Sequence, residues 1–167
     1  MNTRQLKRLR DVKAEAEAWM GSFPEEILGG RCFYFAAAVA ALLGAPVVAG
    51  SALWQFRPDD GVTNTHFGYE FETEIGAGTQ FKIGPTALPE MHVWNVWLGK
   101  VLDLSTSDLP DQLRKGLGVE WDAGMIPPPI YFGPAAGKRD RFRYNADRKA
   151  TALARAFLET LYRRRNR

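Results

Sequence analysis

Three residues of this sequence, Cys32, His92 and Asp103, have side chains that together could carry out acyl transfer. A cysteine thiolate attacks a carbonyl carbon, a histidine returns a proton to the leaving group, and a carboxylate fixes the orientation and tautomer of the imidazole. Cys32 is the only cysteine in the chain, and His92 is one of only two histidines. We therefore expect Cys32 to be the nucleophile, His92 the base and Asp103 the orienting acid. His66 is the alternative base.

Cys32 comes at the predicted start of an apolar helix over residues 31–43, directly after Gly29 and Gly30 and one arginine. At a helix N-terminus, unpaired N–H groups and the positive end of the helix dipole favour a thiolate and supply donors for an oxyanion. Paired glycines would let the backbone of a substrate come close. The alternative is that Cys32 is a core residue, because free cysteine is among the most buried residue types.

The stretch MHVWNVWLGKVLDLST is predicted to form two strands joined by a tight turn. Side chains alternate along a strand, so His92 and Trp94 share one face. A two-residue turn that begins at Leu98 places Asp103 opposite Trp94. A turn that begins at Gly99 places Asp103 opposite Val96, the next residue on the His92 face. Asp103 lies on the His92 face in both registers, but only the first makes it a diagonal neighbour, about 7 Å away between Cα atoms.

Three residues are weaker candidates for binding an oxyanion or the substrate. They are Trp54 and Gln55, on the first predicted strand, and Trp94. We expect the aromatic residues as a whole to form the core and the walls of a groove, and not a cofactor-binding site. No pair of possible ligands has the close local spacing of a zinc site, and no glycine-rich phosphate loop occurs in a strand-to-helix context. We therefore expect neither a metal nor a cofactor.

The elements that must position these side chains can be predicted from hydrophobic periodicity, which indicates an α+β fold in a single domain over residues 1–167. Apolar residues at helical spacing predict an amphipathic helix over 3–20 and a helix that is apolar on every side over 31–43. A third helix is predicted near the C-terminus, capped by Asn145 and with Asp147 in its first turn.

Runs rich in β-branched and aromatic residues predict an antiparallel sheet between the second and third helices. The predicted strands are 47–56, 65–75, MHVWNVWL and VLDL. Glycines and prolines make residues 76–90 and 107–137 connections of low regularity. In the second connection, Pro127 to Phe132 form a stiff run that is either a polyproline spacer on the core or a lid over Cys32.

The order of these residues, with the sequences around them, resembles the transglutaminase-like branch of the papain-type cysteine protease superfamily. GGRCFYFAAAVAALLGAPVVAGSALW is similar to that family's nucleophilic cysteine at the head of a buried helix, followed by a Leu-Gly-x-Pro turn into a strand. MHVWN is similar to its His-x-Trp-Asn strand start, and LDLST to its Asp-Pro-Thr ending. The resemblance covers residues 29–106. It implies a papain-like core, a buried helix against an antiparallel sheet, with Cys32, His92 and Asp103 as the triad.

The resemblance also implies an activity, namely hydrolysis of an amide in a peptide, protein or small molecule through a thioester on Cys32. Two features depart from the family pattern: the spacing from His92 to Asp103 is shorter by about four residues, and Leu104 stands in place of the proline. GGRC is also similar to the Arg-Gly-Gly-x-Cys motif of the arylamine N-acetyltransferases. The alternatives are therefore acyl transfer like that of these enzymes and a non-catalytic binding module on the same scaffold.

Composition and charge limit the other function classes. With 46% apolar residues the chain can bury a full core, while the single cysteine and the absence of a secretory signal pattern favour a cytoplasmic protein. Residues 32–50 are apolar over the length of a membrane span, but Gly44 and Pro46 divide them into a helix and a strand. Residues 138–167 hold eleven basic and three acidic side chains. This net +8 could contact nucleic acid or an acidic membrane, although a solvated helix face is the preferred interpretation.

Overall fold

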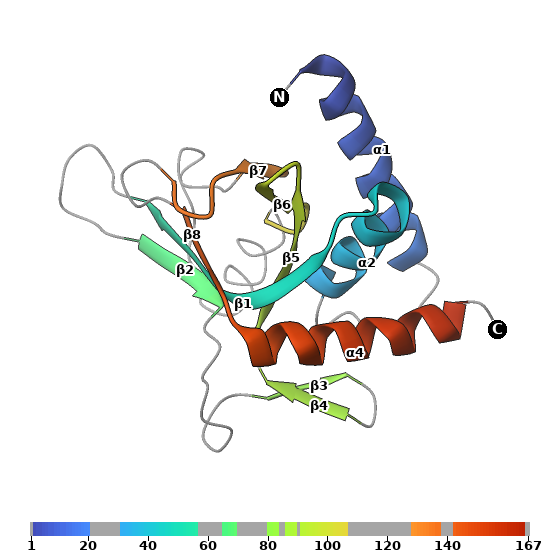
Figure 1. Cartoon of the computed structure of the whole chain (residues 1–167). Coiled ribbons are helices and arrows are strands. Elements are labelled where there is room, and N and C mark those ends of the chain that lie inside the picture. Colours follow the sequence, from blue (N-terminus) through green and yellow to red (C-terminus); the bar gives the residue numbers. More distant parts are fainter. Residues whose placement is uncertain are drawn as a thin grey trace.

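The computed structural model of the chain describes residues 2–20, 31–56, 65–69, 80–83, 86–89, 91–106, 128–137 and 142–165. In this part of the chain, two helices, α2 and α4, lie against a curled antiparallel sheet, and a third, α1, packs on α2 (Figure 1). The helices are α1 (Thr3–Met20), α2 (Arg31–Leu43) and α4 (Arg148–Arg165). The predicted bounds of the first two are confirmed, as is the α+β class.

Six strands form the main sheet, in the order β2-β1-β5-β6-β7, with β8 paired to β1. They are β1 (Val47–Phe56), β2 (Thr65–Tyr69), β5 (His92–Trp97), β6 (Lys100–Asp103), β7 (Tyr131–Gly133) and β8 (Phe142–Ala146). All of the pairings between them are antiparallel. Two further strands, β3 (Gln80–Ile83) and β4 (Thr86–Pro89), form a separate two-stranded sheet.

Helix α2 is the centre of the core, because it is apolar on every side and its residues 32–39 are all buried. The cluster around it includes residues from both other helices: Leu9, Val12 and Ala16 from α1, and Ala150, Ala154 and Leu158 from α4. Gly44 ends the helix with a φ of 65°, a left-handed conformation that glycine adopts without strain. The chain then enters β1, as predicted. None of the described helices combines the length and the apolar composition that a membrane crossing requires.

The sheet carries a different buried cluster on each of its two faces. Val47, Ala49 and Val93 face α2 and belong to the cluster around that helix. Trp54 and Trp94 belong to a second cluster on the opposite face, as expected from the alternation of side chains along a strand. The sheet curls, and α2 and α4 lie on the side away from the second cluster (Figure 1).

Two segments predicted to be irregular contain strands, so that prediction is wrong where the structure describes them. Residues 80–83 and 86–89 form the paired strands β3 and β4, and residues 131–133 form β7, which pairs with β6. Strands of three or four residues carry too little alternation to be recognised locally, and pairing with another strand stabilises them. The last two residues of the proline-rich run, Tyr131 and Phe132, therefore belong to the sheet. Pro127 and residues 70–75 of the second predicted strand lie outside the described residues.

The start of α4 also differs from the prediction, because the cap is Asp147 and not Asn145. Asn145 lies within β8, paired with Ser51, while Oδ1 of Asp147 accepts a hydrogen bond from the Ala150 N–H at 2.8 Å. Asn and Asp are equally good caps, so only the pairing of β8 with β1 decides where the strand ends. A Cβ atom at Gly50 would lie 2.0 Å from the Asn145 carbonyl oxygen, so this close approach requires glycine.

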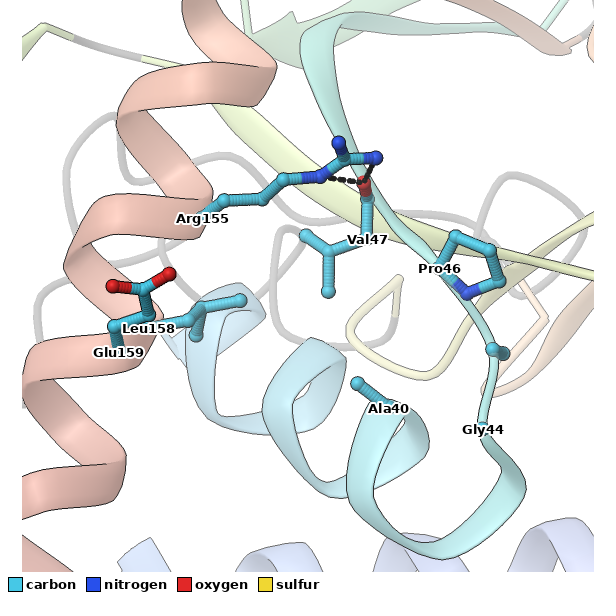
Figure 2. Close-up of a pocket in the computed structure, with 8 residues that line it drawn as sticks. Ala40, Gly44, Pro46, Val47, Arg155, Leu158 and Glu159 are labelled. Atoms are coloured by element: carbon cyan, nitrogen blue, oxygen red, sulfur yellow. Dashed lines mark hydrogen bonds between the residues drawn. The ribbon is translucent and has the colours of Figure 1, made fainter.

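A cavity of about 380 Å³ lies between the end of α2, the start of β1 and α4 (Figure 2). Its described lining is mostly apolar and consists of Ala40, Gly44, Ala45, Pro46, Val47, Arg155, Leu158 and Glu159. Arg155 donates from Nε and Nη2 to the Val47 carbonyl oxygen at 3.2 and 3.1 Å. This guanidinium therefore ties α4 to β1, and the lining contains no member of the predicted triad.

Candidate active site

The β5–β6 hairpin brings His92 and Asp103 together. Its turn residues, Leu98 and Gly99, both have positive φ, 51° and 72°, as a tight hairpin turn of type I′ requires. The strand register is the first of the two predicted registers, with the turn beginning at Leu98. Asp103 is thus the diagonal neighbour of His92, and its Oδ2 lies 2.5 Å from Nε2 of the imidazole.

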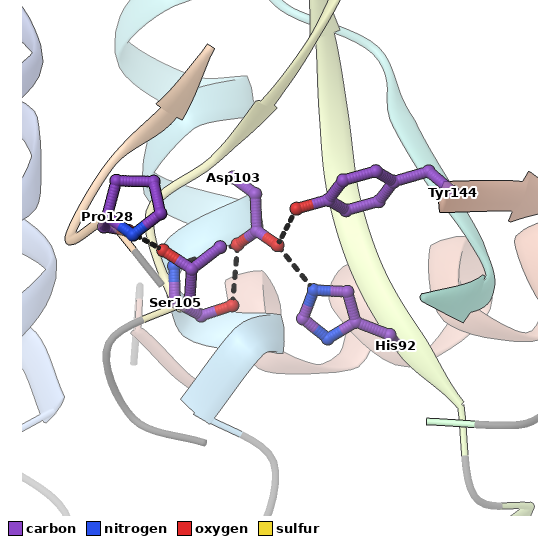
Figure 3. A network of polar contacts seen from close by, with 6 residues as sticks. His92, Asp103, Ser105, Pro128 and Tyr144 are labelled. Atoms are coloured by element: carbon purple, nitrogen blue, oxygen red, sulfur yellow. Dashed lines mark hydrogen bonds and ion pairs between the residues drawn. The ribbon is translucent and has the colours of Figure 1, made fainter. Parts of the chain in front are cut away.

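Asp103 accepts four hydrogen bonds, although only 2% of its surface is exposed. Figure 3 shows the carboxylate between its partners. Oδ2 accepts from His92 and, at 3.1 Å, from the Tyr144 hydroxyl. Oδ1 accepts from the backbone N–H of Ser105 at 2.8 Å and from its Oγ at 2.7 Å. These four donors compensate the cost of removing a carboxylate from water, so Asp103 can remain ionised inside the protein.

Cys32 reaches the imidazole from the first turn of α2. One turn further along, the Ala36 carbonyl oxygen accepts a hydrogen bond from Nδ2 of Asn95 at 3.1 Å. Helix α2 therefore runs beside β5, with its N-terminal end near the His92 end of that strand. Cys32 is among the groups that raise the pKa of His92, so the thiol lies near the imidazole. Asp103 engages Nε2 of the ring, and Nδ1 is buried as well.

The electrostatics of the site favour an imidazolium beside a carboxylate. Burial by itself lowers the pKa of His92, but the charge of Asp103 and hydrogen bonds with Asp103 and Cys32 raise it from 6.5 to about 10. Burial likewise raises the pKa of Asp103, and the charge of His92 with the hydrogen bonds from His92 and Ser105 more than offsets this, so the net change is downward. The two groups therefore form an ion pair at neutral pH.

Aromatic rings enclose the imidazole. Trp94 stacks on His92 with 6.0 Å between ring centroids, and Trp54 meets it edge-on at 5.4 Å. Two of the three side chains predicted for the oxyanion or the substrate thus lie beside the predicted base, and that role remains a prediction. The third, Gln55, pairs through its backbone with His66 of β2. The side chains of Gln55 and His66 lie outside the described part of the structure.

The three members of the predicted triad differ in exposure. Cys32 keeps 7% of its surface open, whereas His92 keeps 1%. Cys32 also belongs to the buried cluster around α2, so the core interpretation of this cysteine describes its packing correctly. Its effect on the pKa of His92 is an additional feature that a core role does not require. Gly29 and Gly30, expected beside the thiol, lie outside the described residues.

Two residues of this polar cluster, Ser105 and Tyr144, were not identified from the sequence. Ser105 had a local signal, because an aspartate side chain often accepts a hydrogen bond from the backbone two residues further on, as in the Asx-turn. Tyr144 had none, since it lies 41 positions from Asp103 along the chain. Only the pairing of β8 with β1 brings its hydroxyl to the carboxylate.

Comparison of the chain with known proteins finds no relative. No protein-family model matches the sequence, and no curated protein and no solved structure shows significant similarity to it. Among the described residues, no three histidine, cysteine, aspartate or glutamate side chains group as metal ligands would. The chemistry open to this site therefore follows from its own geometry, a buried imidazole held by a carboxylate, with Cys32 among the groups that influence its pKa.

Proposed function

We propose that the protein is a cysteine-dependent acyl-transfer enzyme that hydrolyses a peptide bond or a side-chain amide through a thioester on Cys32. One observation carries the proposal: His92 is held by Asp103, with 2.5 Å between Nε2 and Oδ2, and Cys32 is among the groups that raise the pKa of His92. The order Cys, His, Asp and the sequences around these residues, which resemble the transglutaminase-like branch of the papain-type superfamily, support the same conclusion.

Each of the three residues has a defined part in this reaction. The sulfur of Cys32 attacks the carbonyl carbon of the amide, and the C–N bond breaks as the His92 imidazolium gives its proton to the departing nitrogen. Water then attacks the thioester and gives a proton to His92, and the C–S bond breaks to release the acid and restore the thiolate. Asp103 stabilises the imidazolium in both steps and fixes the tautomer.

The start of α2 supports the oxyanion that forms in both steps. The first N–H groups of a helix have no partner within the helix, and they lie at the positive end of its dipole. Cys32 is the second residue of α2, so an oxygen on the attacked carbon would form close to these donors. Stabilising the charge that develops in the transition state is a large term in acyl transfer.

Alkylation by iodoacetamide tests the proposal, because Cys32 is the only cysteine and the extent of labelling reports on it alone. At about pH 6 free cysteine is less than about 1% thiolate. We expect native Cys32 to react at least about tenfold faster than free cysteine under these conditions. His92→Gln should remove the advantage, because no imidazolium then lies beside the sulfur.

His66→Gln is the matched control, since it removes the other histidine of the chain. It should leave the alkylation rate unchanged, and a loss of rate in this variant alone would transfer the role of base to His66. Native protein that reacts no faster than free cysteine, or only after unfolding in urea, would refute the enzyme. Circular dichroism of each variant establishes that its fold is intact.

The second candidate function is a non-catalytic binding module in which Cys32 is a core residue. The 7% exposure of Cys32 and its place in the cluster around α2 favour it. The two functions predict opposite results in the alkylation experiment, because a packed thiol without an imidazolium beside it reacts slowly. Once the thiol is shown to react, the products formed from an amide substrate in the presence of hydroxylamine distinguish two reactions. Hydrolysis gives the acid, and transfer to the amine gives the hydroxamate.

A further inference from the structure

The oxygen of Asp103 that holds the imidazole also holds a tyrosine hydroxyl. Oδ2 accepts from Nε2 of His92 at 2.5 Å and from the Tyr144 hydroxyl at 3.1 Å. In Figure 3 the two donors converge on one oxygen atom, His92 from β5 and Tyr144 from β8. The other oxygen, Oδ1, accepts from Ser105. The Tyr144 hydroxyl therefore acts on the side of the carboxylate that faces His92.

The backbone and the ring of Tyr144 are both held in place. Tyr144 pairs with Ala52 of β1, and its N–H donates to the Ala135 carbonyl oxygen at 2.7 Å. Its buried ring stacks on Tyr131 with 5.2 Å between centroids. Burial, together with the charge of Asp103, raises the pKa of the Tyr144 hydroxyl well above its ordinary value. The phenol therefore stays protonated at physiological pH and remains a donor.

We propose that Tyr144 is a positioning residue of this site, whose hydroxyl holds the Asp103 carboxylate toward His92 and moderates their hydrogen bond by sharing the acceptor atom. The inference rests on the proposed function, because the orientation of His92 affects catalysis only if the thiol reacts. Hydrogen bonding to a carboxylate stabilises its charge and leaves it a weaker base toward a second donor. Strand β8 is thereby part of the site, although it lies outside residues 29–106, which carry the resemblance.

The direction of the effect follows from the groups that face the carboxylate. The described titratable groups that act on the carboxylate or on its partners are His92 of β5, Cys32 of α2, Tyr131 of β7 and Tyr144 of β8. Loss of the Tyr144 hydroxyl leaves more negative charge on Oδ2 for the imidazolium, so His92 should hold its proton more tightly. Tyr131 cannot substitute, because its hydroxyl donates to the Pro134 carbonyl oxygen at 2.5 Å.

Tyr144→Phe and its matched control Tyr131→Phe test the proposal, because each removes one hydroxyl from a stacked ring in the same buried cluster. Nuclear magnetic resonance of ¹⁵N-labelled imidazole reports the protonation of His92 and the shift of its Nε2 proton. In Tyr144→Phe we expect this proton further downfield and the pKa of His92 higher by about one pH unit, the size of one hydrogen bond to a charged group. Tyr131→Phe should keep the wild-type values.

Two results would overturn the role of Tyr144. The first is a Tyr144→Phe spectrum equal to that of the wild type, and the second is an equal change in both variants, which would come from ring packing. If Tyr144→Phe does not fold, wild-type protein labelled with 3-fluorotyrosine provides the second measurement. Its more acidic phenol donates more strongly, so the Nε2 proton should move upfield, and an unchanged shift would overturn the proposal.

Alkylation of Cys32 separates this inference from the proposed function. A reactive thiol together with unchanged His92 resonances in Tyr144→Phe would support the enzyme and refute the role of Tyr144. An unreactive thiol together with shifted resonances would refute the enzyme, while the effect of Tyr144 on the Asp103–His92 pair would stand. His66→Gln assigns the two sets of imidazole signals.

Discussion

Replacing Asp103 by asparagine should destabilise the fold by an amount that depends on pH. Asp103 is the main cause of the rise in the pKa of His92 from 6.5 to about 10, against the effect of burial. The net rise of about 3.5 pH units means that the folded protein favours the protonated imidazole by about 5 kcal/mol. This agrees with the loss of about 3–5 kcal/mol that follows removal of one partner of a buried ion pair. Since His92 is 1% exposed, solvent screens the interaction little.

The sign of the pH dependence follows from the direction of each shift. Because the pKa of His92 is raised in the folded protein, its stabilisation is complete below about pH 6.5 and is lost as the pH rises toward 10. The pKa of Asp103 is lowered, so its contribution is present above the ordinary value of 3.8 and is lost as the pH falls through the folded value. Asp103→Asn should therefore differ most from the wild type between about pH 5 and 6.5.

Urea unfolding followed by tryptophan fluorescence measures this difference at several pH values from about 5 to 10. The matched control is Asp147→Asn, because Asp147 caps α4 through the Ala150 N–H and asparagine caps a helix about equally well. The control should differ from the wild type by a few tenths of a kcal/mol at every pH. A destabilisation by Asp103→Asn that stays constant from about pH 6 to 10 would refute the ion pair between His92 and Asp103.

Three further predictions concern substitutions in the strands and the turn around the site. Asn95 donates from Nδ2 to the carbonyl oxygens of Ala36 and Ala45, both at 3.1 Å. Asn95→Asp should therefore cost about 3–5 kcal/mol in urea unfolding at pH 7, and less in acid, where a protonated carboxyl can donate. Gly50→Ala should cost about 4 kcal/mol or more, because its Cβ would lie 2.0 Å from a carbonyl oxygen of β8. Gly99→Ala meets no atom within 4 Å, and its positive φ should cost only about 1–2 kcal/mol.

Local sequence was sufficient for the elements whose signals are long and repeated. The periodicity of α1, the uniform apolarity of α2 and the break at Gly44 gave their bounds, because helix formation depends on neighbours three and four residues apart. Strand alternation placed His92 and Asp103 on one face, because successive side chains of a strand point to opposite faces. Residue types also identified Cys32, His92 and Asp103 as a possible set, and their catalytic role remains a prediction.

Contacts between distant segments decided everything that local patterns left open. The sequence allowed two turn registers for the β5–β6 hairpin. In the structure, where both strands pack within the sheet, the turn begins at Leu98. Likewise, β7 and β8 exist because they pair with β6 and β1, and Tyr144 reaches Asp103 only through that pairing. Periodicity shows which face of an element is buried, but not which distant segment covers it, since the free energy of pairing belongs to both partners.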